Sequence, residues 1–506
     1  MINDVIKQID AIAAKDPERI AYDYLGQTNT YGELKARSND YAAKIVEAHL
    51  PAKAPIMIWG GQTFEMIASF LGAVKTGHAY IPISSDSNSE RLTMIQEVSR
   101  AKFIIAIDPL PIDMKGMQVV TPQDVAQQDF EPNPHYFVQG DDNYYIIFTS
   151  GTTGKPKGVQ ISHKNLLSFV NWELTDFDLP AKPNFLAQAP YSFDLSVMSL
   201  YPALTAGGRL TVLPHEATAS IGELFRVLPK FDINVWVSTP SFAEMCFLDP
   251  TFDQKHHQNL SRFLFCGEEL SHKTAVMLQK KFPQAHIFNT YGPTETTVAV
   301  TQVEITPAIL KKYDRLPIGY VKDDTAITID TSKGEQPGQG EIIINGPSVS
   351  KGYLHNPEKT QAAFFQDNSD ENPNYRTGDL GFFDDKLLFY RGRIDFQVKF
   401  NGYRIELQEI NFYLSKSPLV KYGVVAPKYS RDHKVRQLVA VVVLTDEAQQ
   451  QYQDCEEDLT KELRDFLAAN IMPYMIPQRF VYRDEMPISQ NGKVDLKAVI
   501  KEANEA

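Results

Sequence analysis

The sequence predicts an α/β protein in which a large N-terminal domain of layered α/β sheets is joined by a hinge to a smaller C-terminal α+β domain. The chain has 506 residues, more than one compact hydrophobic core normally organises. Short β-branched runs alternate with helical stretches over roughly the first 400 residues, as in α/β proteins. The pattern changes after Asp395. We therefore predict domains over residues 1–394 and 395–506.

Strands of the large domain are predicted where β-branched and aromatic residues cluster over a few positions. Helical stretches separate these runs, and one helix is expected to open near Lys164. The polar, proline-containing segment 366–374 is expected to be a surface loop. The predicted strands include 144–148, 235–238, 262–265 and 342–344.

The smaller domain is predicted to mix strands and helices after Asp395. Pro418 fits the break between its first helix and the next strand, because proline disrupts a helix interior. Asp458 is the expected N-cap of a second helix, which Pro473 would stop after about Asn470. The expected elements are strand 396–400, helix 406–415, strands 420–425 and 438–443, and helix 458–470.

The composition excludes some functional classes. The chain has 50 basic and 63 acidic side chains and a net charge of −13, whereas a nucleic-acid-binding protein usually has a basic balance or patch. No apolar run approaches the roughly 20 residues that span a bilayer, so membrane insertion is not expected. Charged residues interrupt the N-terminal segment 1–17, which therefore lacks a signal-peptide core. Cys246, Cys266 and Cys455 lack metal-site or disulfide spacing, and we expect a cytoplasmic protein.

A loop rich in glycine and hydroxyl side chains at 149–158 is the strongest single motif. Its glycines let backbone N–H groups turn toward an anion, while its hydroxyls and lysines add donors and positive charge. Pro156 stands where a Walker A loop requires serine or threonine, so this is a different phosphate loop. A flexible surface loop is the alternative. The residues expected to contact a triphosphate are Thr149, Ser150, Gly151, Thr152, Thr153, Gly154, Lys155 and Lys157.

The loop resembles the phosphate-loop signature of the adenylate-forming superfamily, which comprises acyl-CoA synthetases, adenylation domains of peptide synthetases, and luciferases. Further stretches resemble the superfamily in the same order along nearly the whole chain, which a chance match would not produce. The resemblance implies an ATP-dependent, AMP-forming acid–thiol ligase, a class that forms carbon–sulfur bonds. The matching stretches are 30–34, 71–83, 289–295, 340–342, 375–380, 392–395, 399–406 and 491–495.

The resemblance assigns several of these stretches to ATP. Tyr291 offers an aromatic face to adenine, and Thr294 a hydroxyl to the α-phosphate. Glu295 is suited to Mg²⁺, because magnesium prefers hard oxygen ligands. Asp379 is assigned to both ribose hydroxyls, although it could simply form a turn after Gly378. Besides the phosphate loop and Lys493, the expected ATP-binding residues are Asn289, Thr290, Tyr291, Gly292, Pro293, Thr294, Asp379, Tyr390, Arg391, Gly392 and Arg393.

The superfamily pattern makes Lys493 the catalytic residue, which bridges the substrate carboxylate and the α-phosphate. Attack of a carboxylate on phosphorus brings two anions together, and a cation between them offsets their repulsion. Asp395 falls at the family's hinge, about which the small domain is expected to rotate after adenylation. Arg393 resembles a second ribose or phosphate contact, whereas Arg391 could equally be a solvated surface charge.

Asp194 indicates that the activated acid is an amino acid. Superfamily members that activate amino acids have an aspartate at this position for the substrate ammonium, and a buried carboxylate needs such a partner. Asp194 could also cap a helix that begins at Leu195, and one residue could do both. Within the superfamily the chain resembles freestanding enzymes that activate D-alanine, whose side-chain pocket is lined at positions matching Cys266 and Val298. Cys266 could also be an inert core residue, and the preference for D over L comes from the resemblance alone.

Those enzymes transfer the D-alanyl group to the phosphopantetheine thiol of a separate carrier protein, for D-alanylation of lipoteichoic acid. We expect the same partner here, because no carrier-domain sequence follows Asp495. Two alternatives share the adenylation step: an acyl-CoA synthetase, against which Asp194 argues, and a stand-alone enzyme for another small amino acid. A non-catalytic nucleotide-binding regulator is disfavoured, because both Lys493 and Glu295 are present.

Overall fold

The computed structural model describes residues 1–151, 154–334, 336–367, 371–430, 434–453, 455–487 and 496–505. The chain divides into two compact units. Unit 1 comprises Met1–Asp86, Gln96–Phe148 and Gly158–Ile394; unit 2 comprises Ser87–Ile95, Thr149–Lys157 and Asp395–Ala506. Both units mix helices with strands, which confirms the predicted fold class. Unit 2 thus contains the loop 149–157 as well as the C-terminal segment.

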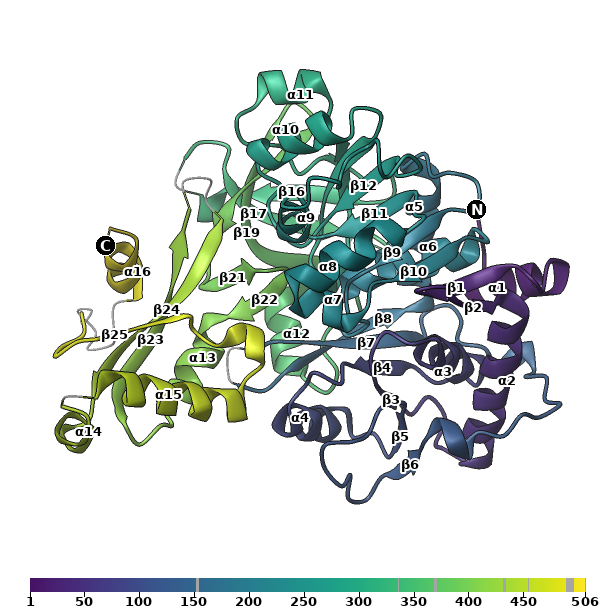
Figure 1. Cartoon of the computed structure of the whole chain (residues 1–506), viewed down its shortest axis with the longest axis horizontal. Coiled ribbons are helices and arrows are strands. Elements are labelled where there is room, and N and C mark those ends of the chain that lie inside the picture. The colour runs from purple at the N-terminus through teal and green to yellow at the C-terminus, as the bar shows by residue number, and fades with distance from the viewer. Residues whose placement is uncertain are drawn as a thin grey trace. The chain divides into compact units, whose positions relative to one another are not determined.

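A six-stranded sheet forms one layer of unit 1. In spatial order its strands are β6 (Gln118–Val120), β5 (Phe103–Ala106), β3 (Ile56–Trp59), β4 (Tyr80–Ile83), β7 (Asn143–Thr149) and β8 (Lys157–Ser162). Strand β3 pairs in parallel with β4 and β5, and all three strands are buried at every position. Continuous burial is typical of parallel strands that are covered on both faces. Helix α3 (Phe64–Lys75) packs on β3 and β4, and also on α2 (Tyr31–Glu47) (Figure 1).

A nine-stranded sheet forms a second layer of unit 1. In spatial order its strands are β15 (Tyr320–Val321), β14 (Thr301–Glu304), β13 (His286–Tyr291), β12 (Arg262–Phe265), β11 (Val235–Ser238), β9 (Asn184–Ala187), β10 (Arg209–Val212), β1 (Ile20–Tyr24) and β2 (Gln27–Thr30). Strands β11, β12 and β13 are parallel, and Phe265 lies opposite Asn289. Strand β1 joins the sheet through β10, where Tyr22 lies opposite Leu210. The residues that follow β12 and β13 therefore meet at one edge of the sheet.

A third sheet of unit 1 positions the residues around Asp379. Its strands are β16 (Ala326–Asp330), β17 (Gly340–Asn345), β18 (Phe364–Phe365), β19 (Asn374–Asp384) and β20 (Leu387–Arg393). The long strand β19 pairs antiparallel with β17 on one side and β20 on the other. The register of β19 and β20 sets Asp379 directly opposite Arg393.

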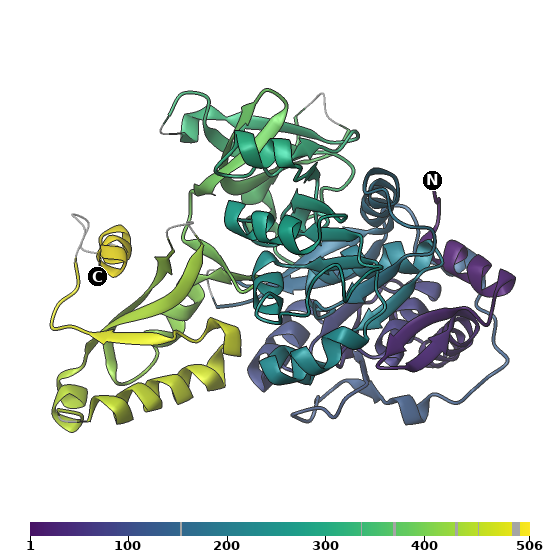
Figure 2. The same ribbon diagram turned by 45° about the horizontal axis from the view of Figure 1, so that its top comes forward.

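Unit 2 is built on a three-stranded sheet whose two faces carry different helices. Its elements are β21 (Gln397–Phe400), β22 (Tyr403–Glu406), α13 (Leu407–Leu414), β23 (Val420–Tyr429), β24 (Val435–Leu444), α15 (Glu456–Asn470), β25 (Arg479–Tyr482) and α16 (Leu496–Glu505). The even-numbered residues 438–444 of β24 share a buried cluster with α13 and α15. The odd-numbered residues 439–443 share another with α16, as the two-residue period of a strand requires. Figures 1 and 2 show α13 and α15 on one face and α16 on the other.

Further helices cover the sheets and connect their strands. They are α1 (Val5–Lys15), α4 (Ser89–Ser99), α5 (His163–Asp176), α6 (Val197–Thr205), α7 (His215–Ala219), α8 (Ile221–Val227), α9 (Pro240–Cys246), α10 (His272–Lys281), α11 (Pro307–Lys312), α12 (Pro357–Ala363) and α14 (Asp446–Gln451). The expected N-cap at Asp458 is wrong, because α15 begins at Glu456 with Cys455 at the N-cap. Asp458 instead belongs to an acidic first turn, where negative charge complements the helix dipole.

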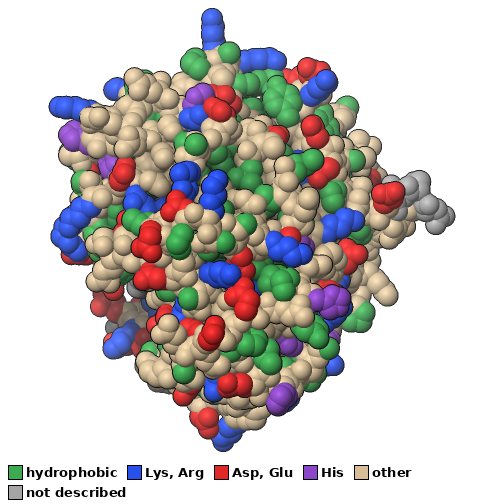
Figure 3. All heavy atoms as spheres, turned by 90° about the vertical axis from the view of Figure 1, so that its right-hand side faces the viewer, with side chains coloured by type: hydrophobic (Ala, Val, Ile, Leu, Met, Phe, Trp, Pro, Cys, Tyr) green, Lys and Arg blue, Asp and Glu red, His purple; other side chains and the backbone are tan. Residues whose placement is uncertain are grey.

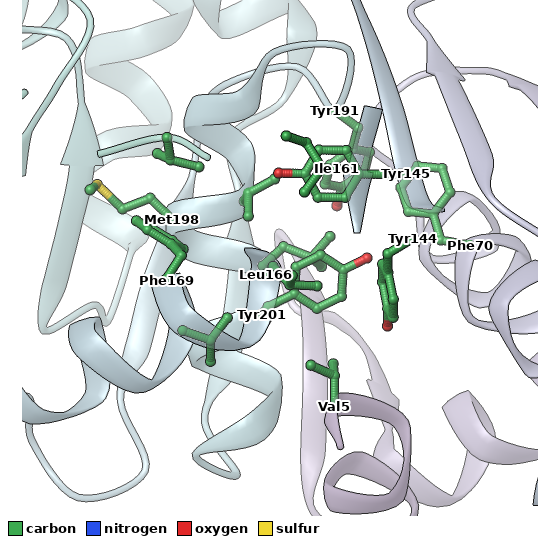
Figure 4. Packing of buried hydrophobic residues seen from close by; sticks show 14 of the residues in the cluster. Val5, Phe70, Tyr144, Tyr145, Ile161, Leu166, Phe169, Tyr191, Met198 and Tyr201 are labelled. Atoms are coloured by element: carbon green, nitrogen blue, oxygen red, sulfur yellow. The ribbon is translucent and has the colours of Figure 1, made fainter. Parts of the chain in front are cut away.

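Aromatic side chains fill the largest core of unit 1. Figure 4 shows Tyr144, Tyr145 and Tyr201 among aliphatic residues of this cluster. Tyr144 meets Tyr201 edge-on with ring centroids 5.5 Å apart, and Phe70 meets Tyr191 edge-on at 5.4 Å. Such pairs contribute about 0.5–1.5 kcal/mol each beyond the area that they bury. The core thus gains directional contacts as well as hydrophobic burial.

The surface in Figure 3 intersperses acidic and basic side chains with apolar ones. Among the helices of the described residues, none combines the length and the hydropathy that a bilayer crossing requires.

Candidate active site

Asp379 stands at the centre of a buried polar cluster in unit 1. The Tyr291 hydroxyl donates to Asp379 Oδ2 at 2.6 Å, and Arg393 Nη1 donates to Asp379 Oδ1 at 2.6 Å. The backbone N–H of Asp379 donates to Thr377 Oγ1 at 3.0 Å. These bonds follow from the fold, because Asp379 faces Arg393 across a hairpin and Tyr291 ends β13. The structure therefore brings together three residues that the sequence analysis assigned to ATP.

The chemistry of this cluster suits a diol. Burial raises the pKa of Tyr291 well above its usual range, and the neighbouring Asp379 carboxylate raises it further, so Tyr291 remains a hydrogen-bond donor. A carboxylate has about four acceptor positions. The fixed bonds from Tyr291 and Arg393 use one position on each oxygen of Asp379 and hold the group rigid. Its remaining acceptor capacity matches the two hydroxyls of a ribose.

The side chains of Asn289 and Thr290, near the end of β13, are hydrogen-bonded to backbone carbonyls of the protein. The amide nitrogen of Asn289 donates to the Pro317 carbonyl at 2.7 Å, and the Thr290 hydroxyl donates to the Phe265 carbonyl at 2.8 Å. Both side chains are thereby committed to the protein backbone. They set the position of Tyr291, and contact of Asn289 and Thr290 with ATP stays a prediction.

Glu295 is a fully buried carboxylate just after the turn of Gly292 and Pro293. It lies in a short 3₁₀ turn, Thr294–Thr296, which also contains the predicted phosphate contact Thr294. The hydroxyl of Tyr353 donates to Glu295 Oε1 at 2.8 Å. Tyr353 carries no motif signal that the sequence analysis used, and only the tertiary structure reveals it.

Glu295 could supply the one protein carboxylate that Mg²⁺ needs when it is bound together with a nucleotide. Magnesium in nucleotide sites takes one or two protein carboxylates and completes its octahedron with phosphate oxygens and water. Within the described ranges, no cluster of three or more histidine, cysteine, aspartate or glutamate side chains could hold a metal alone. Glu295 is therefore a candidate for a shared ion and not for an all-protein cage.

Cys266 and Val298, the two residues predicted to line the side-chain pocket, lie together. The Cys266 thiol is 3.7 Å from the Val298 carbonyl oxygen, and both residues are buried. Val298 and the preceding Thr297 have left-handed backbones, with φ of 69° and 59°. Gly292 permits this path, because a Cβ there would lie 2.5 Å from the Ala299 Cα.

Asp194 begins a 3₁₀ turn, Asp194–Ser196, that leads into α6. Ser196 holds the N-cap position of α6, so Asp194 lies before the cap and not at it. The side chain of Asp194 is half-buried. Its neighbour Leu195 belongs to the same buried cluster as Cys266 and Val298. This arrangement is compatible with the assigned role of Asp194 beside the pocket, which stays a prediction.

The charged residues of β20, the strand before Asp395, lie in different environments. Arg393 is nearly buried on Asp379, whereas Arg391 is exposed and stacks on Phe382, with its guanidinium 4.8 Å from the ring centroid. This cation–π contact lies at the surface, and contact of Arg391 with ATP stays a prediction. Asp395 accepts a hydrogen bond from the backbone N–H of Gln397 at 3.1 Å, as in an Asx turn.

Residues 149–157 of the predicted phosphate loop lie in unit 2, where their donors contact carboxylates. The backbone N–H of Gly151 donates to Glu409 Oε2 at 3.1 Å, and Lys157 Nζ lies 3.4 Å from Glu406 Oε1. Burial raises the pKa of Glu409 to about 7. The sequence analysis gave neither glutamate a role, although Glu406 ends the matching stretch 399–406. Both contact the loop across about 250 residues of sequence separation. Of the expected contacts, Thr152, Thr153 and Lys493 lie outside the described residues.

Within the loop, a Cβ at Gly154 would lie 3.0 Å from the Phe412 ring, and its φ is 76°. Both facts favour glycine at this position. Ser150 donates to the Arg404 carbonyl at 2.9 Å, while Lys155 is exposed. The loop thus has a composition suited to binding anions. In this structure, three of its donor groups contact a backbone carbonyl or a glutamate carboxyl group.

Comparison with known proteins gives matches along both parts of the chain. The family described as AMP-binding enzyme matches residues 9–354, and the AMP-binding enzyme C-terminal domain matches residues 413–493. D-alanine–D-alanyl carrier protein ligase of Lactiplantibacillus plantarum is 53% identical over 514 aligned positions that cover 100% of both chains. The ligase of the same name from Streptococcus pneumoniae (strain P1031) is 47% identical, with 99% of both chains covered.

Among solved structures, the adenylation domain AlmE of Vibrio cholerae, in complex with glycyl-adenosine-5'-phosphate, matches with a TM-score of 0.82. The two sequences are 23% identical, and the match covers 99% of this chain and 98% of that one. At this identity the likeness shows a shared fold.

Proposed function

The chain belongs to the AMP-binding enzyme family, and from this membership we propose that it activates D-alanine as D-alanyl-AMP and transfers the D-alanyl group to a carrier-protein thiol. The observation that carries the proposal is identity of about one half, over the whole length of both chains, with D-alanine–D-alanyl carrier protein ligases. The buried cluster of Tyr291, Asp379 and Arg393 supports it, because its chemistry suits the ribose of ATP.

In the first half-reaction, a carboxylate oxygen of D-alanine attacks the α-phosphorus of ATP. The bond from that phosphorus to the oxygen bridging to the β-phosphate breaks, and pyrophosphate leaves. Asp379 holds the ribose hydroxyls, and Tyr291 fixes Asp379 while offering its ring to adenine. Thr294 faces the α-phosphate, and Lys493 neutralises the approaching anions. Glu295 would hold Mg²⁺, which when bound supplies positive charge to the phosphates.

Amino-acid recognition rests on charge and on size. The Asp194 carboxylate pairs with the substrate ammonium, and its half-buried position strengthens that attraction relative to water. Cys266 and Val298 close the pocket around the methyl group. Larger side chains would collide with this pair, because both residues are packed in the core.

In the second half-reaction, the phosphopantetheine thiol of the carrier loses its proton and its sulfur attacks the acyl carbon. The bond from that carbon to the AMP oxygen breaks, which gives a thioester and AMP. Residues 395–506 form the mobile domain and turn about Asp395 between the two steps. The carrier protein is separate, and the thioester supplies lipoteichoic acid D-alanylation. We place the enzyme in the cytoplasm, where ATP is available.

The experiment is amino-acid-dependent exchange of pyrophosphate into ATP, with D-alanine, L-alanine, glycine, D-serine and a short fatty acid compared side by side. Exchange that strongly favours D-alanine is expected. Asp194→Asn should raise the D-alanine requirement far more than the ATP requirement, and Lys493→Ala should abolish exchange while ATP still binds. Exchange with the fatty acid and none with D-alanine would refute the proposal.

The thiol acceptor is tested separately. Wild-type protein loaded with D-alanine is offered a holo carrier protein, the matching apo carrier and free CoA. A thioester on the holo carrier alone is expected. Efficient transfer to CoA would instead make the protein an acyl-CoA synthetase.

A further inference from the structure

The turn that presents Val298 is conformationally strained. Thr297 and Val298 are both β-branched, and both have φ in the left-handed region, at 59° and 69°. Such conformations cost of order 1–3 kcal/mol each, and they persist only where the surrounding structure fixes them. Contacts with neighbouring residues must therefore stabilise this turn.

The side chain of Thr297 supplies one such restraint. Its hydroxyl donates to the Ser348 carbonyl at 2.7 Å, and Thr297 is fully buried. On the other side of the turn, the N–H of Val300 donates to the Tyr291 carbonyl at 2.8 Å. The turn is thus tied at one end to the β13 strand and at its apex to the segment 347–349.

The segment 347–349 is itself held from two sides. Asn165 Nδ2 donates to the Pro347 carbonyl at 2.7 Å and to the Val349 carbonyl at 2.9 Å. Lys322 Nζ donates to Ser348 Oγ at 2.7 Å, and its side chain is 2% exposed. Hydrogen bonds from a buried ammonium are among the stronger ones in proteins. These bonds fix the position of the Ser348 carbonyl independently of Thr297.

We propose that Thr297 is a positioning residue for amino-acid selection. Its hydroxyl, anchored on the 347–349 segment, holds the left-handed turn that sets Val298 against Cys266. Loss of this bond lets the turn relax toward ordinary backbone angles, which moves Val298 and changes the size of the pocket. The proposal rests on the proposed function, and it concerns which amino acid is selected, not whether adenylation occurs.

The matched variants are Thr297→Val and Thr297→Ser. Valine keeps the shape of threonine but removes the hydroxyl, which leaves a buried carbonyl without this donor; serine keeps the donor. One buried hydrogen bond corresponds to about a tenfold change in an equilibrium constant. We expect Thr297→Val to raise the KM for D-alanine about tenfold, to lower the preference for D-alanine over D-serine and D-valine, and to leave the KM for ATP unchanged. Thr297→Ser should stay close to wild type in all three.

A second variant tests the route through Ser348. Lys322→Met removes the ammonium that fixes Ser348 and should shift the same preference in the same direction, by less. Unchanged preference in a folded Thr297→Val protein, or equal rises in both KM values, would overturn the inference. A wild-type protein without D-alanine-dependent exchange would refute the proposed function instead, so the two failures are distinguishable.

Discussion

Breaking the buried ion pair between Lys75 and Asp10 should strongly destabilise unit 1. Lys75, at the end of α3, donates to Asp10 Oδ1 on α1 at 3.0 Å. It also donates to Ser38 Oγ at 2.9 Å and Asn39 Oδ1 at 2.8 Å, both on α2. All three ammonium hydrogens thus have acceptors, and one side chain ties three helices together. We predict that Asp10→Asn destabilises the protein and that Lys75→Met partly suppresses this loss.

The expected magnitude follows from burial. Removing one member of a buried ion pair costs about 3–5 kcal/mol, because the remaining charge stays buried without its partner. The Lys75 side chain is 0% exposed, whereas that of Asp10 is 18% exposed, so water partly compensates and we expect about 3 kcal/mol. Replacing a buried ion pair by well-packed hydrophobic residues of similar volume is often nearly neutral, and removing both charges at least leaves neither one buried alone. Asp10→Asn combined with Lys75→Met should therefore cost less than Asp10→Asn alone.

Tryptophan fluorescence during urea unfolding is a suitable assay. The chain has three tryptophans, and Trp59, Trp172 and Trp236 are all buried in unit 1. The signal therefore reports the unit that contains the ion pair. A double-mutant cycle over both single variants and the combined one isolates the coupling between Lys75 and Asp10.

The cycle has a clear negative outcome. If Asp10→Asn lowers the free energy of unfolding by under about 1 kcal/mol, or if both substitutions add without coupling, the pair behaves as a surface salt bridge. The argument from burial would then be wrong. Lys44→Met is a matched control, because its partner Glu47 is half exposed and the pair should contribute little.

Three further predictions concern buried carboxyl groups. Tyr353→Phe removes the hydroxyl on Glu295 and should raise the Mg²⁺ concentration for half-maximal exchange about tenfold, without changing the KM for D-alanine; an unaltered Mg²⁺ dependence contradicts this. Glu173 has no hydrogen-bond partner among the described residues, and burial raises its pKa well above the usual range, so the contribution of Glu173 to stability should fall as pH rises above about 4.3. Glu173→Gln should therefore be more stable than wild type at pH 8, and its advantage over wild type should be smaller at pH 5. Calorimetry that finds the same stability difference at both pH values refutes this prediction. Burial likewise raises the pKa of Glu409 to about 7, so its contribution to stability falls as pH rises toward 7. Glu409→Gln should flatten that part of the calorimetric pH profile, and an unchanged slope in the variant contradicts this.

The sequence predicted strands most accurately where burial is continuous. The expected runs 235–238 and 262–265 coincide with β11 and β12, because central parallel strands are apolar on both faces. Helix boundaries were harder to place. The first turn of α15 contains several acidic residues, and local pattern does not decide which residue precedes the first helical turn.

The order of motifs indicated Asp379, Tyr291 and Arg393 as site residues, but not that they bind one another. That contact depends on the register of a hairpin and on the end of a strand from another sheet. The left-handed backbone at Thr297 and Val298 was equally hidden, because β-branched residues disfavour it locally. Tertiary contacts such as the hydrogen bond to Ser348 help to stabilise it.

The pairing of β1 with β10 has a consequence for synthesis on the ribosome. Tyr22 emerges long before its partner Leu210, by roughly 10–40 s at about 5–20 residues per second. During that interval the N-terminal hairpin has an open edge, which another nascent chain can occupy. Because of the same pairing, residues 20–30 can join the sheet only after β10 has been synthesised, and they then cover its edge. Initiation at an internal codon beyond them would leave β10 as a bare edge and favour self-association of the shortened product.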